Sequence, residues 1–189
     1  MDGLGNKGAL VPVEGTIVFA LVAAQVQTGQ ALSLLAAGIA AQRQLLSRAA
    51  ALVQPPQGRV VERQGDGLLL LFADPHAALS WAQASQALCP AEPGHPTSAT
   101  LALRIGAHHG QVLSDGSALF GHGVNLAARI AAVAGPGETL LSAPTQAQAS
   151  PAWRALLEDL GPYYLKHFDE PQQLFKLGPS PALRMTGTA

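Results

Sequence analysis

The sequence predicts an α/β (α+β) fold of the split βαβ type, with a ferredoxin-like, palm-type βαββαβ core and a C-terminal β extension. Three observations lead to this prediction. Apolar runs of strand length alternate with longer helical segments. A Gly-Asp-Gly turn joins two apolar runs into a hairpin, and an Asp-Pro pair opens a second helix. The order strand, helix, hairpin, helix, strand is that of the split βαβ plan.

The first half of the chain supplies a strand, a helix and the hairpin. Residues 16–22 form a continuous apolar run rich in β-branched side chains, which predicts a buried strand. Residues 31–53 have the length and pattern of a helix that a proline-rich loop closes. Residues 60–64 and 68–72 flank the turn at 65–67 and are predicted to pair.

The second helix begins after Asp74, because aspartate caps a helix and the following proline fits its first turn. We expect it to run to about Leu88 and to be followed by a proline-containing loop at 89–100. Two strands, 101–107 and 111–113, come next.

A third helix is predicted to begin after Gly123 and to end near Gly135. It is followed by a short strand at 139–141. The last predicted elements are a closing pair of strands, 163–166 and 172–177.

The composition fits one compact soluble domain. With 189 residues, 48% of them hydrophobic and only 12% charged, the chain can bury a sizeable core. We place the domain at 15–178, with flexible ends at 1–14 and 179–189. The net charge of −1 provides no basic field, so nucleic acid is not expected as a partner.

The expected location is the cytoplasm. Cys89 is the only cysteine, so no internal disulfide can form, and without neighbouring metal ligands we expect it to be inert. The N-terminus lacks the basic region of a signal peptide, and no apolar stretch reaches the ~20 residues of a membrane span. No membrane partner is expected.

Asn125 and Arg129 lie four residues apart in the third helix, so that both project from one face. The glycines at 121 and 123 allow the backbone to approach whatever those side chains hold. An amide can orient an oxygen, and a guanidinium can neutralise phosphate charge. The same pattern also fits an amphipathic helix whose Arg129 is merely solvated.

Four segments, taken in order, closely resemble the catalytic domain of class III adenylate/guanylate cyclases, the cyclase homology domain. The resemblance extends from about Gly15 to Leu177. The segments are residues 60–72, 104–110, 120–129 and 164–171.

The resemblance implies a head-to-tail dimer with active sites across the interface. One protomer would supply two metal-binding aspartates, and the other an asparagine and an arginine. The implied reaction converts a nucleoside triphosphate to a 3′,5′-cyclic monophosphate and pyrophosphate, as a phosphorus-oxygen lyase, in cyclic-nucleotide signalling.

The first metal position departs from the family pattern. Leu21 stands where the family has an aspartate at the end of its first strand, and leucine cannot ligate Mg²⁺ or Mn²⁺. Asp66 matches the second aspartate, although Gly-Asp-Gly also makes an ordinary hairpin turn. Glu14 lies at the far end of the strand and is no substitute. We therefore expect binding of Mg²⁺ or Mn²⁺ to be weakened.

The base-recognition positions match the family only in part. Glu62 matches the residue that reads the purine edge, where the resemblance associates glutamate with guanine and lysine with adenine. A carboxylate accepts hydrogen bonds from guanine N1–H and its 2-amino group. Glu62 could equally be a solvent-facing strand residue, and the second position is Ala118, which makes no side-chain hydrogen bond. GTP is thus weakly preferred over ATP.

The phosphate-binding positions match the family pattern better than the metal and base positions do. Asn125 and Arg129 match, and Lys166 matches the lysine that contacts the terminal phosphates, or is simply an exposed charge. His167 replaces the usual next glycine, which removes backbone freedom. His108 and His109 are strand neighbours that point to opposite faces, so neither is predicted as a metal ligand.

Three functions remain open. The chain could be an active nucleotidyl cyclase that tolerates Leu21, although we expect its homodimer to be weak or inactive. It could be the complementary half of a heterodimeric cyclase, because Asn125, Arg129 and Lys166 are kept. It could also be a non-catalytic pseudo-cyclase that binds a nucleotide or a protein.

Overall fold

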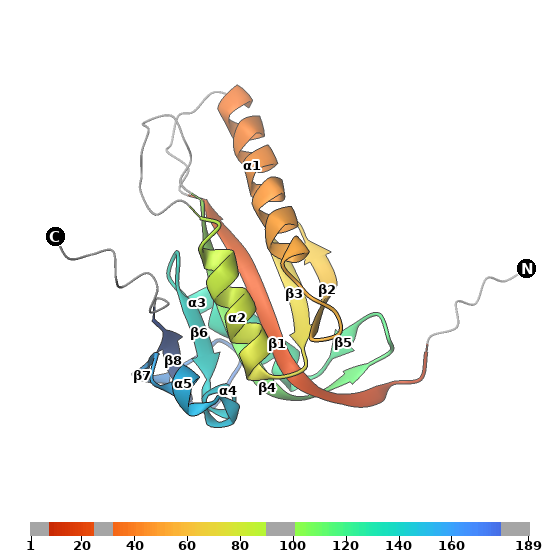
Figure 1. Ribbon diagram of the computed structural model, residues 1–189, viewed down its shortest axis with the longest axis vertical. Helices are drawn as coiled ribbons and strands as arrows, with labels where there is room; N and C mark the ends of the chain where they lie inside the picture. Colours follow the sequence, from red (N-terminus) through yellow and green to blue (C-terminus); the bar gives the residue numbers. More distant parts are fainter. Residues whose placement is uncertain (1–7, 25–31, 90–100, 179–189) are drawn as a thin grey trace, which may run out of the picture.

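The structure is a computed structural model that describes residues 8–24, 32–89 and 101–178. Within these residues, eight strands form one sheet and five helices pack around it (Figure 1). In chain order the elements are β1 (Val11–Ala24), α1 (Leu32–Ala51), β2 (Gly58–Gln64), β3 (Gly67–Phe72), α2 (Pro75–Gln86), β4 (Leu101–Ser114), β5 (Leu119–Phe120), α3 (His122–Val133), β6 (Thr139–Ser142), α4 (Ala143–Gln148), α5 (Pro151–Arg154), β7 (Leu157–Tyr163) and β8 (Gln172–Leu177).

The sheet order confirms the predicted α+β fold with its split βαβ core. The strands lie in the order β2-β3-β1-β4-β6-β8-β7, and β5 pairs with β4. β1 is antiparallel to both β3 and β4, so the first six elements form a βαββαβ unit with β1 in its interior. α3 then connects β4 to the parallel strand β6, and β8 and β7 extend the sheet.

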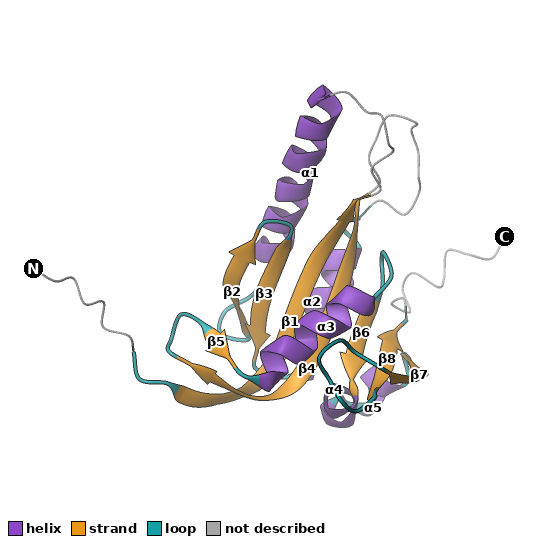
Figure 2. Cartoon of the chain, turned by 180° about the vertical axis from the view of Figure 1, so that it is seen from behind, coloured by secondary structure: helices purple, strands orange, loops and turns teal. Residues whose placement is uncertain are grey.

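The helices cover the two faces of the sheet unequally. α1 and α2 lie on one face (Figure 1), and α3 crosses the other face over β1 and β4 (Figure 2). The period of two along β1 explains this: Val18 and Ala20 pack in the cluster with α1 and α2, whereas Ile17 packs with Ala127 of α3. Beside α3 the second face keeps only partial cover, since Phe19 is half-buried.

The close approach of α3 depends on a glycine in β4. A Cβ built on Gly106 would lie 2.2 Å from the backbone nitrogen of Ala131 and 2.5 Å from the carbonyl oxygen of Ala127. These are backbone atoms of α3, so the helix would have to move to admit a side chain. Gly106 therefore sets how deeply α3 sits on the sheet.

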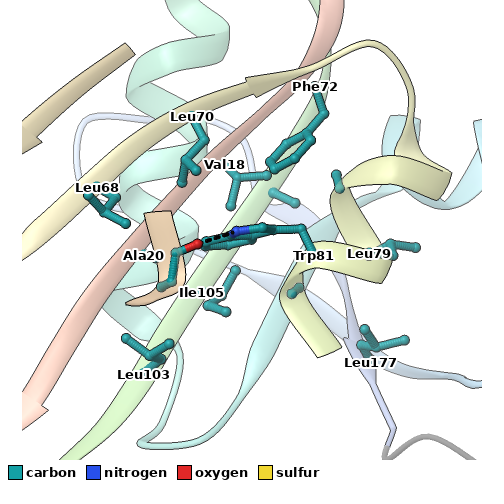
Figure 3. Close-up of a cluster of buried hydrophobic side chains, with 14 of the residues drawn as sticks. Val18, Ala20, Leu68, Leu70, Phe72, Leu79, Trp81, Leu103, Ile105 and Leu177 are labelled. Atoms are coloured by element: carbon teal, nitrogen blue, oxygen red, sulfur yellow. Dashed lines mark hydrogen bonds between the residues drawn. The ribbon is translucent and has the colours of Figure 1, made fainter. Parts of the chain in front are cut away.

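The core between the sheet and α2 is centred on Trp81, whose ring lies among strand side chains such as Val18, Leu70 and Ile105 (Figure 3). Its indole Nε1–H donates to the Ala49 carbonyl of α1 at 2.9 Å. This bond ties α2 to α1 inside the core.

We expect Trp81→Phe to lower the free energy of unfolding by about 1–3 kcal/mol, because it removes this buried hydrogen bond, leaving the Ala49 carbonyl only the Leu52 N–H at 3.2 Å, and creates a small cavity. Urea denaturation measures the change. Tyr164→Phe, on a side chain that is 80% exposed, is the control and should leave the midpoint unchanged. Equal midpoints for Trp81→Phe and the wild type would mean that this bond stabilises nothing.

Several predicted elements are confirmed, among them α1, the β2–β3 hairpin and β8. The start of α2 is also confirmed: Asp74 is its N-cap, and its Oδ1 accepts from the Ala77 N–H at 2.9 Å. No helix within the described ranges is both long and apolar enough to cross a membrane.

The expected flexible end at 1–14 is wrong for residues 11–14. β1 begins at Val11, and it pairs with β4 without interruption as far as Ser114. For the same reason the two predicted strands 101–107 and 111–113 are one strand, since the continuous ladder to β1 carries β4 through the intervening residues. Residues 1–7 and 179–189 lie outside the described residues.

The predicted strand 163–166 is also wrong, because β7 covers residues 157–163 and the chain turns at 165–168. The elements β5, α4 and α5 were not predicted, because they are too short to give a periodic signal in the sequence. Apart from Cys89, the predicted loop at 89–100 lies outside the described residues.

Candidate active site

The end of β1 and the hairpin turn bring the two predicted metal positions together. Leu21 pairs with Gly67 across the β1–β3 ladder, and the Val22 N–H donates to the Asp66 carbonyl at 2.8 Å. The Leu21 side chain leans over the glycine, since a Cβ on Gly67 would lie 2.8 Å from Leu21 Cδ2. A methyl group therefore occupies the space beside the turn where a carboxylate would be needed.

These residues do not fit the two-cation site that the family resemblance implies. Asp66 is exposed and is the only carboxylate of the pair, because leucine has no oxygen to offer. Among the described residues, no group of three or more His, Cys, Asp or Glu side chains could hold a metal ion. No catalytic step is assigned to a metal held by this chain alone.

Arg104, for which the sequence predicted no role, lies directly opposite Leu21 on β4. Paired residues of neighbouring strands share a face, so both side chains lie on the α3 side of the sheet. The Arg104 Nε is buried without a hydrogen-bond partner, and no carboxylate of the described residues lies within 4.0 Å of its guanidinium.

A sequence signal for Arg104 did exist. β4 alternates, with Leu103 and Ile105 fully buried on the α1–α2 side. An arginine between two such residues must face the other side of the sheet, where the end of β1 also lies. That Arg104 lies opposite Leu21 depends on the β1–β4 register, which the sequence alone does not fix.

α3 presents Asn125 and Arg129 away from the sheet. Leu126, Ala127 and Ile130 are buried beneath the helix, whereas Asn125 is exposed and Arg129 is half-buried. Their spacing of four residues puts both on one face, as the sequence predicts.

Lys166 lies at the tip of a tight turn that packs against α3. The Phe168 N–H donates to the Leu165 carbonyl at 3.1 Å and closes the turn. Leu165, only 3% exposed, belongs to the same cluster as Leu126 and Ile130 of α3. The structure thus brings the turn that carries Lys166 alongside the helix that carries the other two predicted phosphate residues.

His167 occupies the position where the family pattern has a glycine. Its φ of 69° makes it the only non-glycine residue with positive φ among residues 8–24, 32–89 and 101–178. As the third residue of the turn it needs this left-handed conformation, which favours glycine. The turn survives the replacement at a cost of about 1–2 kcal/mol in backbone energy.

The two predicted base-recognition residues lie on different strands. Glu62 is exposed on the edge strand β2 and pairs with Leu69, so it shares the α3 side of the sheet. Ala118 is half-buried just before β5, in a loop held by Asp115, whose Oδ1 accepts from the Ala118 N–H at 2.7 Å. This hydrogen bond holds the pKa of Asp115 below its ordinary value.

The adjacent histidines make separate contacts on opposite faces of β4, as predicted. His108 Nδ1 lies 2.9 Å from Ser142 Oγ, under the start of α3. His109 Nδ1 lies 3.0 Å from Thr16 Oγ1, and its Nε2 lies 3.5 Å from Glu14. Both rings thus have neighbours within the fold.

Burial, with smaller contributions from the charges of His122 and His109, lowers the pKa of His108 from 6.5 to about 4. The folded state therefore keeps this ring neutral, and its contribution to stability is complete above pH 6.5. As the pH falls from 6.5 to 4 the unfolded state takes up the proton first. We expect a loss of about 1–3 kcal/mol over this range, allowing for solvent screening of a half-buried ring.

Urea denaturation at pH 7 and pH 4.5 measures this effect, with His108→Gln as the comparison. The wild type should lose more stability than the variant. An equal loss in both proteins would place the acid sensitivity elsewhere.

Burial raises the pKa of the Cys89 thiol, so this residue has little thiolate at neutral pH.

Comparisons with known proteins agree on one family of folds. No family model matches the chain. A Rhizobium meliloti (strain 1021) protein named "Putative adenylate cyclase 3" is 33% identical over 129 residues, which cover 68% of this chain and 22% of that protein. The crystal structure of an adenylate/guanylate cyclase/hydrolase from Silicibacter pomeroyi superposes with a TM-score of 0.70 at 22% identity, covering 90% of this chain and 100% of the other.

The chain has the fold of the adenylate/guanylate cyclase domains. The guanylate cyclase domain of RhGC from Catenaria anguillulae, solved in complex with GTP, superposes with a TM-score of 0.68 at 18% identity, covering 89% of this chain and 98% of the other. The chain spans between 22% and 32% of the length of the curated relatives that it matches first.

Proposed function

We propose that the chain is a nucleotidyl cyclase domain in cyclic-nucleotide signalling that supplies the phosphate-binding half of an active site and needs a partner for the metal-binding half. The observation that carries the proposal is an asymmetry. Asn125, Arg129 and Lys166 are present and displayed on or beside α3. The metal half has Asp66 but a leucine methyl group beside it.

In a head-to-tail dimer with a second cyclase domain, each of these three phosphate-binding residues would have a defined role. The Asn125 amide would orient the ribose or a phosphate oxygen, and the Arg129 guanidinium would neutralise charge that develops on the transferred phosphate. Lys166 would hold the terminal phosphates that leave as pyrophosphate. The partner would supply two aspartates and the Mg²⁺ or Mn²⁺ ions bound to them.

The reaction would be an intramolecular displacement. The ribose 3′-oxygen attacks the α-phosphorus in line, the bond from that phosphorus to the bridging oxygen breaks, and pyrophosphate leaves. The hydroxyl proton passes to solvent. Glu62 could accept two hydrogen bonds from guanine, whereas Ala118 offers none, so GTP would be the weakly preferred substrate.

A non-catalytic role is the second candidate, and Leu21 is the observation that favours it. A protein without its own metal half could still bind a nucleoside triphosphate, or a second cyclase domain, through the face of α3. Such a module would keep Arg129 and Lys166 for affinity and would form no product with any partner.

A cyclase assay on the purified chain tests the proposal. ATP and GTP are supplied separately with Mn²⁺, and cyclic products are measured by mass spectrometry. We expect little or no product from the chain alone, although a fluorescent triphosphate analogue should bind. Vigorous turnover by the homodimer would overturn the division into two halves, and absence of triphosphate binding would overturn the nucleotide site itself.

A further inference from the structure

The turn that carries Lys166 is attached to the start of α3 by a second contact. The Phe168 ring packs edge-on against the ring of His122, with the centroids 4.8 Å apart and the planes inclined at 65°. His122 is the first residue of α3 and follows Gly121, whose φ is 125°. This contact joins two segments that are remote in the sequence.

Lys166 is therefore held between two anchors. On one side Leu165 is buried against Leu126 and Ile130, and on the other side Phe168 is half-buried against His122. The Lys166 side chain is exposed, and no carboxylate of the described residues lies within 4.0 Å of its ammonium group. What fixes its direction is the backbone of the turn, which the two anchors clamp to α3.

The left-handed residue of the turn makes the second anchor important. His167 holds a left-handed conformation that is unfavourable for a non-glycine residue, so a turn free at one end could relax and swing its tip. The aromatic contact between Phe168 and His122 opposes that relaxation.

We propose that His122 and Phe168 are positioning residues that aim Lys166 at the terminal phosphates of a nucleoside triphosphate bound along α3. The inference rests on the proposed function, in that Lys166 must contact those phosphates. Asn125 and Arg129 lie on α3 itself, so the helix alone fixes their positions. Lys166 lies on a separate turn, and His122 holds that turn against the helix.

The test measures binding of GTP and GMP, each with Mn²⁺, to the full chain by isothermal titration calorimetry. His122→Ala and Phe168→Ala should each weaken GTP binding about three- to tenfold. GMP has no terminal phosphates, so its affinity should stay within about twofold. Phe168→Tyr, which keeps the ring, should restore wild-type GTP affinity.

A double-mutant cycle separates positioning from general packing. In a Lys166→Ala background, His122→Ala should cause no further loss of GTP affinity, because the side chain that it aims is gone. Tyr164→Ala, next to the turn on a side chain 80% exposed, is the matched control and should change neither affinity. Thermal melting of every variant confirms that the fold is retained.

The outcomes distinguish this inference from the proposed function. If Lys166→Ala lowers GTP affinity and His122→Ala does not, the clamp is refuted while the nucleotide site stands. Equal losses for GTP and GMP, or additive losses in the cycle, would also overturn positioning. If the wild type binds no GTP, or Lys166→Ala changes nothing, the proposed function fails and the inference fails with it.

Discussion

Leu21→Asp is expected to convert a weak or silent homodimer into an active cyclase in the presence of Mn²⁺. The replacement puts a carboxylate beside the Asp66 turn, where the Leu21–Gly67 pairing already brings the two positions together. A second oxygen ligand allows the site to hold a cation that stabilises the developing charge, an effect worth several kcal/mol. We expect a gain on the order of 100-fold in the rate of cyclic product formation.

Two further variants make the experiment specific. Leu21→Asn has nearly the same shape as the aspartate variant but no charge, so it should gain little. Adding Asp66→Asn to the Leu21→Asp chain should return the rate to its starting level. A Leu21→Asp protein that is folded, dimeric and no faster than the wild type would mean that the site differs from the family pattern at more than this one residue.

Arg129→Ala is expected to weaken triphosphate binding by about 1.5–3 kcal/mol, which is about a 10- to 150-fold rise in Kd. Arg129 is half-buried on α3, and within the described ranges no carboxylate lies within 4.0 Å of it. Its charge-assisted hydrogen bonds are therefore available to phosphate. Calorimetric titration with GTP measures the loss.

Arg43→Ala is the matched control for this experiment. It removes the same side chain from an exposed position on α1, on the opposite face of the sheet. Its effect on GTP affinity should be below about twofold. Equal affinities of the Arg129→Ala variant and the wild type would remove the phosphate role from α3.

Local chemistry made most of the core predictable from the sequence. The Asp74 cap with its following proline and the Gly-Asp turn of the hairpin are encoded within a few residues, and each appears where predicted. The order of the elements then leaves few ways to arrange them in a sheet. The extent of β1 was missed because its first residues include Pro12 and Glu14, which have low strand propensity, and only the ladder to β4 reveals it.

The sequence predicted which residues belong to the candidate site, but not which of their neighbours from remote segments they contact. Asn125 and Arg129 share a helix face, which spacing alone gives. The opposition of Arg104 and Leu21 depends on strand register, and the contact of His122 with Phe168 depends on how a turn packs on a helix. Neither can be derived from spacing, because each joins segments that are far apart in the chain.

The most direct test of the proposed function is a mixed dimer made from two versions of this chain. The wild type keeps Arg129 but lacks the first aspartate, and a Leu21→Asp, Arg129→Ala double variant has the opposite pair. The two chains are co-expressed with different tags, the doubly tagged dimer is purified, and its cyclase activity with ATP or GTP and Mn²⁺ is compared with that of each homodimer. We predict that the mixed dimer forms cyclic product much faster than the mean of the two homodimers. A mixed dimer no faster than that mean, or a failure of the two chains to pair, would contradict the division of the active site between a phosphate half and a metal half.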